Sequence, residues 1–162
     1  DLEVLRWNGS AWSKERPPST MDLRGVWGSG PDSVWLVGDE GILHWDGAGW
    51  SNALTEPGIN LQAVAGRAAD DVWAVSSRGL VLHWDGSGWA RSQPVSNHSL
   101  FAVCASGEEV WLVGTVLLRR TAEGWSQENT GTTARLRACA VGETALWAAG
   151  DGARIVRREV ER

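Results

Sequence analysis

The sequence predicts an all-β fold built from repeated units of four short antiparallel strands. Two patterns predict it: a segment of about 40 residues recurs along the chain, and no stretch shows a sustained apolar period of 3.6 residues. The composition agrees, because 12 Trp and 20 Gly stand beside one Phe and no Tyr, which favours short strands, tight turns and repeated large anchors. At 162 residues the chain has the size of one domain, so we assign residues 1–162 to a single unit.

The repeat is recognised by the residues at which its units begin. They start at Leu23, Leu61, Leu100 and Leu136, which are 38, 39 and 36 residues apart. A late Trp precedes the next unit by 11 residues in every case. Length varies most between the second and third strands, as expected for a hairpin loop between strands that keep their register.

The strands of the first unit illustrate the others. We expect them at residues 23–27, 33–38 and 41–45, with a fourth strand that begins at Gly49 and Trp50. The loops between them carry Asp and Gly, which supply the backbone conformations of tight turns. The second and third strands are apolar on both faces, as in a sheet that lies between two neighbours. The sequence therefore predicts a β-propeller, and the second choice is a parallel β-helix.

The two ends of the chain hold incomplete units. Residues 4–7 and the segment from Trp12 supply a third and a fourth strand, whereas the last unit supplies only its first three strands. We expect residues 1–22 to complete the last blade, which would close a ring of four blades and remove its unpaired edges. The third strand is then present twice, at residues 4–7 and 155–158, so the alternative is an arc of a larger ring completed by further copies.

Charge and motifs exclude several functions. The net charge is −5 and the isoelectric point is 5.2, which disfavours nucleic acid and anionic membrane surfaces as partners. No run of 18 apolar residues exists, so we expect no membrane insertion. Cys104 and Cys139 lack zinc-ligand spacing and are interpreted as small buried residues. No catalytic triad, phosphate-binding loop or dinucleotide fingerprint is present, and we expect no metal, no cofactor and no catalytic residue.

The segment VWGSGPDSVWLVGDEGILHWDGAGW, residues 26–50, resembles the repeat of bacterial, especially myxobacterial, Trp-rich β-propellers. These are distantly similar to the Asp-box (BNR) and photosystem II assembly-factor-like propellers. The resemblance covers nearly the whole chain and implies a periplasmic, cell-surface or secreted protein. It leaves the activity open, because such propellers include hydrolases, lectins and assembly factors. The segment 39–45 has one residue more than an Asp-box before its Trp.

Residues at repeated positions are assigned structural roles. The tryptophans of the second strands are expected to be buried between blades: Trp35, Trp73, Trp111 and Trp147. His44 and His83 share one repeat position, which favours a structural hydrogen bond between blades over catalysis. Acidic residues recur before each second strand, and we expect them to serve the loop backbone rather than a metal: Asp32, Asp70, Asp71, Glu108, Glu109 and Glu143.

The candidate ligand site combines residues that break the repeat with residues on one loop face. Trp27 replaces a small residue of the other units and could form the floor of a pocket, and Trp50 and Trp89 lie near turns where an indole can stack on a ligand. The other candidates are polar: Arg24, Asp39, Glu40, Arg78 and His98. The sequence therefore predicts a non-catalytic binding or scaffold protein, a monomer or small homo-oligomer, with a protein or carbohydrate ligand. The alternatives are a glycosidase-like hydrolase, although the tyrosine nucleophile of sialidases is absent, and a ring segment that assembles with further copies.

Overall fold

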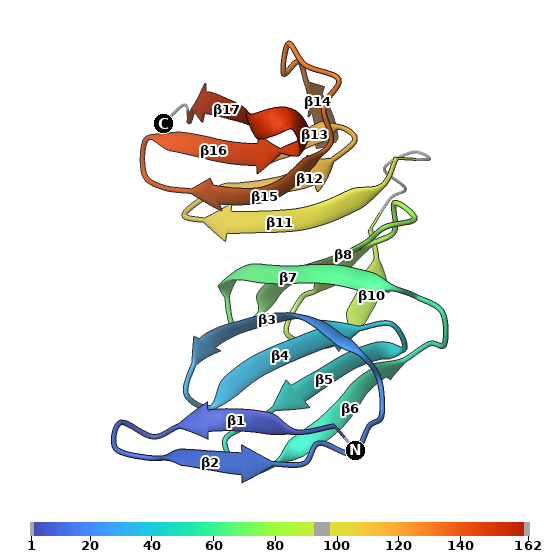
Figure 1. Ribbon diagram of the computed structural model, residues 1–162, viewed down its shortest axis with the longest axis vertical. Coiled ribbons are helices and arrows are strands. Elements are labelled where there is room, and N and C mark those ends of the chain that lie inside the picture. The colour runs from blue at the N-terminus through green and yellow to red at the C-terminus, as the bar shows by residue number, and fades with distance from the viewer. Residues whose placement is uncertain (1, 93–97, 161–162) are drawn as a thin grey trace.

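The computed structural model describes residues 2–92 and 98–160, which form five antiparallel sheets placed one after another in an open arc (Figure 1). In the described part of the chain, the only helical element is the short 3-10 turn η1 (Asp151–Ala153). None of the described residues forms a helix long and apolar enough to cross a membrane. The all-β prediction is confirmed.

Three sheets have four strands each, and we call them blades 1 to 3. Their innermost strands begin at Leu23, Leu61 and Leu100, where the sequence repeat begins. In each blade the strands pair in chain order, each with the one before it. Blade 1 contains β3 (Leu23–Gly30), β4 (Ser33–Gly38), β5 (Gly41–Trp45) and β6 (Trp50–Thr55). Blade 2 contains β7 (Leu61–Ala68), β8 (Asp71–Ser76), β9 (Val81–Trp84) and β10 (Trp89–Arg91). Blade 3 contains β11 (Leu100–Ser106), β12 (Glu109–Gly114), β13 (Leu117–Thr121) and β14 (Gly124–Glu128).

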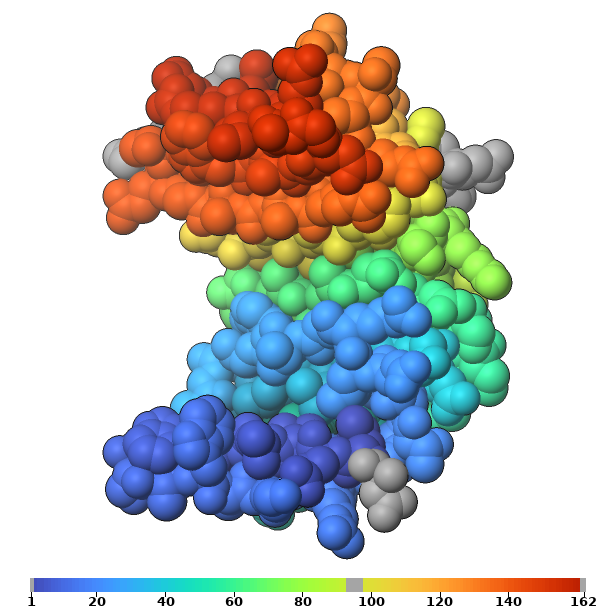
Figure 2. Space-filling view, in the orientation of Figure 1, coloured from blue at the N-terminus to red at the C-terminus, as the bar shows by residue number. Residues whose placement is uncertain are grey.

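The two ends of the chain form smaller sheets at opposite ends of the arc, blue and red in Figure 2. Blade 4 has three strands, β15 (Leu136–Val141), β16 (Ala145–Gly150) and β17 (Arg154–Glu159). The N-terminal hairpin consists of β1 (Val4–Trp7) and β2 (Trp12–Glu15). By their place in the repeat, β1 and β2 are a third and a fourth strand without a first and a second.

The core lies between the sheets rather than within one central layer. Each interface joins apolar side chains from the second and third strands of one blade to those of the next, as between blades 1 and 2, where Trp35, Val37 and Ile42 meet Val72 and Leu82. Trp35 and Trp111 are 1% exposed, and Trp73 is 3% exposed. The prediction that these indoles are core anchors is therefore confirmed.

Trp147 differs from its three counterparts. It is 50% exposed, although it occupies the same position on β16 that Trp35 occupies on β4. The prediction of burial is wrong at this position, because no sheet of the described residues covers that face of blade 4. The repeat alone cannot distinguish an inner blade from the last one.

The two cysteines form a disulfide, and the interpretation as small buried thiols is corrected. Cys104 lies on β11 and Cys139 on β15, and their Cα atoms are 6.1 Å apart. The two residues differ in repeat position: Cys104 pairs with Trp111 across its blade, whereas Cys139 pairs with Ala148. The Cys104 side chain thus points toward the next blade and the Cys139 side chain toward the preceding one, so that they meet between blades 3 and 4.

The N-terminal strands do not complete the last blade, contrary to expectation. In the described part of the chain β1 pairs only with β2, and blade 4 ends at β17. Six residues of β17 pair with β16, from Arg154 to Glu159, so this strand occupies the edge that β1 would need. The hairpin instead packs on blade 1, where Val4 lies against the cluster of Met21, Leu36 and Leu43.

Candidate functional site

The principal groove lies between the N-terminal hairpin and blade 1. Its volume is about 510 Å³, within the usual range of ligand sites. Most of its lining is apolar, and it is formed by Val4, Leu5, Arg6, Trp7, Asn8, Glu15, Val26, Pro31, Val34, Leu36, Trp45 and Trp50.

One wall of the groove is the free edge of β1. All four residues of β1 line it, from Val4 to Trp7. Because successive side chains of a strand point to opposite faces, four consecutive lining residues mean that the groove runs along the strand's edge rather than over one face. The main-chain N–H and C=O groups on this edge have no strand partner in the described part of the chain, since β1 pairs only with β2.

The same place is filled in the complete blades. In blade 1 the second strand occupies it, and β4 pairs with β5 from Val34–Trp45 to Val37–Ile42. Equivalent ladders join β8 to β9 and β12 to β13. The groove is therefore the site of a missing second strand.

The floor of the groove presents apolar surface from blade 1. Val26 on β3 is 66% exposed, which is unusual for a valine in the interior of a repeat. Its counterpart in blade 2 is Val64, which is only 7% exposed because blade 1 covers it. Leu36 and Trp45 also line the groove, and both are buried, at 5% and 8% exposed.

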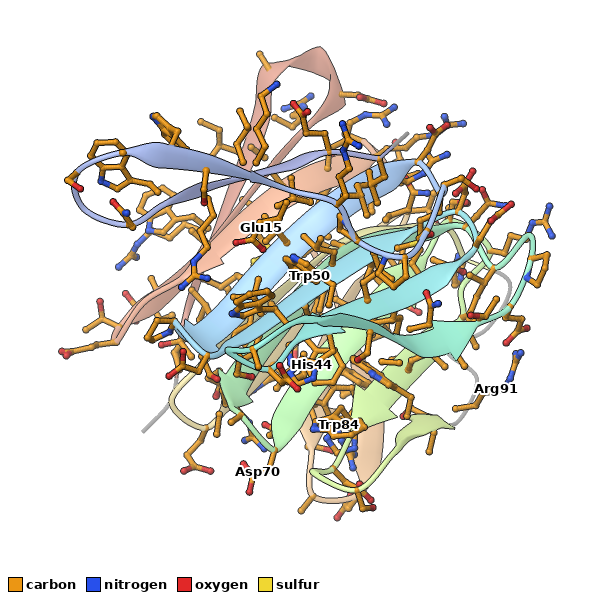
Figure 3. The ribbon with its side chains drawn as sticks, turned by 90° about the horizontal axis from the view of Figure 1, so that it is seen from below. Glu15, His44, Trp50, Asp70, Trp84 and Arg91 are labelled. Carbon is orange, nitrogen blue, oxygen red and sulfur yellow. A yellow bond between two sulfur atoms is a disulfide. The ribbon has the colours of Figure 1, made fainter. Side chains whose placement is uncertain are left out.

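The charged side chains of the groove, Arg6 and Glu15, already have partners. The Trp50 indole N–H donates to Glu15 Oε2 at 2.8 Å, and the two labelled side chains point toward one another in Figure 3. Arg6 lies 3.5 Å from the other Glu15 oxygen, and its guanidinium is 4.8 Å from the centre of the Trp45 ring. A ligand in this groove would therefore meet mainly apolar side chains and the main chain of β1.

The structure brings only one of the predicted ligand residues, Trp50, into the groove. Trp27 faces blade 2 instead, where its ring lies so close to Gly66 that a Cβ there would come within 2.6 Å of it. Trp89 packs edge-on against Trp35 with the ring centres 5.2 Å apart. These two tryptophans serve the interface between blades 1 and 2.

The polar candidates are separated from the groove. The Asp39 carboxylate accepts the backbone N–H of Asp22 at 2.9 Å, and Glu40 lines a separate hollow of about 190 Å³ beside Pro18 and Asn52. Arg24 and Arg78 are exposed. The ring of His98 lies 3.4 Å from the Thr115 hydroxyl, in blade 3. The predicted set therefore does not converge on one site.

Sequence reasoning missed the residues that form the groove, namely β1 and the exposed Val26. A signal was present, because residues 4–7 and the segment from Trp12 read as a third and a fourth strand without a first and a second. The prediction places these two strands in the last blade instead. Only the packing of Val4 on blade 1 decides where they lie.

The two repeated histidines are structural within their own blades, rather than between blades. His44 stacks on Trp35 with ring centres 4.0 Å apart, and His83 stacks on Trp73 at 3.9 Å. His83 also lies 2.7 Å from Asp71. Burial raises the pKa of that carboxyl, but hydrogen bonds from Arg67 and His83 outweigh burial and leave the pKa below its ordinary value.

His44 makes stability depend on pH. Burial lowers its pKa, because the charged imidazolium loses hydration, and the nearby Asp46 offsets this only in part. The unfolded chain therefore binds more protons than the folded one below about pH 6.5, and stability should fall as the pH drops through this value. We expect His44→Phe, which keeps a ring over Trp35, to make this decline shallower in urea titrations. An unchanged slope would exclude His44 as its source.

The acidic residues of the loops before the second strands do not converge. Among residues 2–92 and 98–160, no group of three His, Cys, Asp or Glu side chains is placed to hold a metal ion. Glu109 is instead paired with Arg119 at 2.7 Å, and Asp71 with Arg67 and His83. These pairs fix the second strand of a blade to its third strand or, through Arg67, to its first strand.

Solved structures with the same arrangement of sheets decide the fold. The chain is similar to the catalytically inactive H270A virginiamycin B lyase from Staphylococcus aureus, with a TM-score of 0.79 and 16% identity over 97% of this chain and 62% of that one. The chain has the β-propeller fold. A propeller of YCF48 bound to D1 peptide matches with a TM-score of 0.68 and 16% identity over 96% of this chain and 57% of that one.

A third propeller neighbour comes from a nidogen/laminin complex, with a TM-score of 0.73 and 7% identity over 95% of this chain and 68% of that one. No protein family and no curated protein matches the chain. The chain spans about three-fifths of the length of the first two neighbours. At these identities the likeness establishes the propeller fold, and propellers of this kind include binding proteins and a lyase.

Proposed function

We propose that this propeller is a non-catalytic binding module that accepts an extended polypeptide strand of a protein partner in the groove beside β1. The observation that supports it is the free edge of β1 above an apolar floor, at the place where the complete blades put their second strand. A peptide added to such an edge gains main-chain hydrogen bonds, and side-chain pockets give specificity. The proposal replaces the predicted loop-face site with this groove.

The repeat also indicates which side chain the groove would prefer. The second strand of blade 1 points Trp35 at the next blade, where its ring centre lies 5.0 Å from that of Trp84 and 5.2 Å from that of Trp89. The equivalent pair in blade 1 is Trp45 and Trp50, which line the groove. We therefore expect the ligand strand to carry an aromatic residue, with an apolar residue two positions later.

Support for a protein partner comes from the chemistry of the groove. A strand edge offers alternating N–H and C=O groups that pair with another main chain, whereas the polar side chains that a sugar would need are already engaged, as in the Glu15–Trp50 hydrogen bond. One of the similar propellers was solved with a bound peptide. No residue of the groove is assigned a catalytic role.

A peptide that copies the second strand of blade 1 tests the proposal. We expect the capped sequence Ser-Val-Trp-Leu-Val-Gly, flanked by lysines for solubility, to bind the protein in a calorimetric or fluorescence titration. The same peptide with Trp replaced by Ser should bind at least about tenfold more weakly, equivalent to about 1.4 kcal/mol. Equal binding of the two peptides would contradict the aromatic preference, and no binding of either would contradict the proposed groove.

Two matched variants locate the binding. Val26→Glu places a charge on the exposed floor and should abolish peptide binding without affecting the core, since Val26 is largely in solvent. Ile155→Glu introduces the same charge at an equally exposed apolar residue at the opposite end of the arc and should leave peptide binding unchanged. If both variants weaken binding alike, the groove is not the site.

A further inference from the structure

The two ends of the arc expose apolar faces. Blade 4 exposes Trp147 and Ile155 beside a shallow hollow of about 360 Å³, whose remaining lining is mostly alanine. The N-terminal hairpin exposes Leu5, Trp7 and Trp12. Together with Val26, these five are all the exposed large apolar side chains of the described chain, and Leu5 and Trp7 line the groove as Val26 does. Blade 4 and the N-terminal hairpin lie at opposite ends of the arc, red and blue in Figure 2.

The exposed face of the hairpin points backward, away from blade 1. Val4 packs on blade 1, and Arg6 lies over the Trp45 ring of that blade. Since side chains alternate along a strand, Leu5 and Trp7 point to the opposite face. Trp12, whose ring centre is 5.4 Å from that of Trp7, lies with them. This is the face that a complete blade turns toward its predecessor.

The exposed face of blade 4 points forward. Trp147 occupies the position of Trp35, which in blade 1 faces blade 2. Arg157 of the same blade covers one side of the Trp147 ring, with its guanidinium 5.7 Å from the ring centre. The other side is open to solvent, where Trp35 has a following blade.

The two faces are therefore the two halves of one interface that the chain already contains. Trp35 meets Trp84 and Trp89 of the next blade, with ring centres 5.0 and 5.2 Å away. Trp73 meets Trp125 at 5.3 Å. In the N-terminal hairpin, Trp7 and Trp12 occupy the positions of Trp84 and Trp89, since each pair joins the third and fourth strands of its unit.

We propose that a second copy of this chain docks head to tail, with Trp147 of blade 4 seated against Trp7 and Trp12 of the other copy's hairpin. The contact continues the stacking of blades from one copy into the next. Leu5 and Trp7 also line the groove, whereas Trp12 and Trp147 do not, so the latter two are used to test assembly separately from peptide binding.

The contact joins different surfaces, so each copy keeps one free face until a ring closes. The hairpin supplies only the outer half of a blade, which makes a single contact smaller than a standard interface of about 1,600 Å². Assembly should therefore depend on protein concentration. Two copies that form both contacts would close the ring.

Particle mass tests the proposal. Sedimentation of the wild-type chain should show species of at least about twice 17.5 kDa whose share rises with concentration. Trp147→Ser and Trp12→Ser should each shift the protein to the monomer with unchanged circular dichroism, because both side chains are largely exposed. Mixing the two variants should restore a one-to-one pair that grows no further, because each variant retains the face that the other needs.

Several outcomes would overturn head-to-tail docking. These are a monomer at every concentration, an oligomer that survives both substitutions, or a mixture in which the two variants do not associate. Ile155→Ser with Trp7→Ser repeats the experiment at other positions on the same faces. Because Trp7 also lines the groove, this pair reports on assembly and not on peptide binding. Val26→Glu is the matched control and should assemble like the wild type, so that loss of peptide binding and loss of assembly are separate results.

Discussion

Trp35→Ala is expected to lower the free energy of unfolding by about 3–5 kcal/mol. The indole of Trp35 is 1% exposed and lies between His44 of its own blade and Trp84 and Trp89 of the next. Truncation removes this contact area and leaves a cavity between two sheets that are fixed by their own ladders and cannot collapse. Urea or thermal unfolding followed by circular dichroism measures the loss.

Trp147→Ala is the matched control for this prediction. The residue has the same repeat position, but half of its side chain is already in solvent, so its truncation should cost about 1 kcal/mol or less when the protein is dilute and monomeric. Trp35→Phe should fall between the two, because the buried Trp35 Nε1 has no hydrogen-bond partner to lose. Equal losses for Trp35→Ala and Trp147→Ala would contradict the packing described above.

Loss of the Cys104–Cys139 disulfide is expected to cost about 3–4 kcal/mol, in line with a closed loop of this length. The two cysteines are separated by 35 residues in the sequence, and the bond joins the innermost strands of blades 3 and 4. Without it the unfolded chain gains conformational freedom, while the folded chain keeps the rest of the interface, which includes Trp111 and Leu146. The midpoint of urea unfolding, with and without reductant, measures the effect.

The double substitution Cys104→Ala and Cys139→Ala separates the bond from other effects of the reductant. The variant should unfold at the midpoint of the reduced wild type and should not respond to reductant. If reductant leaves the wild-type midpoint unchanged at a concentration that demonstrably frees both thiols, the bond contributes nothing to stability.

Much of the fold could be predicted because the same spacing of strands and turns occurs several times in the sequence. The period, the fixed distance from each late Trp to the next Leu, and the Gly and Asp turns placed the strands of blades 1 to 3 within a few residues. Burial of Trp35, Trp73 and Trp111 followed from the same repetition. Each of these properties is set by local turn chemistry and by contacts that recur.

The features that could not be predicted lie at the two ends of the chain, where the units of the repeat are incomplete. The sequence contains the third strand at both ends, so either β1 or β17 could occupy the last blade. The pattern of apolar residues is similar in the two strands and does not decide between them. The packing of Val4 on blade 1 and the six-residue pairing of β17 with β16 decide between them. The groove, the exposure of Trp147 and the disulfide all follow from contacts between units, which spacing within a unit does not encode.

The position of the disulfide makes the two ends of the arc unequal in local stability. In a row of sheets that touch only their neighbours, loss of structure starts where a terminal sheet has the least to hold it. A disulfide ties the C-terminal sheet to its neighbour, whereas the two strands at the other end pack on blade 1 through noncovalent contacts such as those of Val4, Arg6 and Glu15. Local unfolding should therefore begin at the N-terminal hairpin beside the groove. A strand bound there would stabilise this less stable end of the molecule.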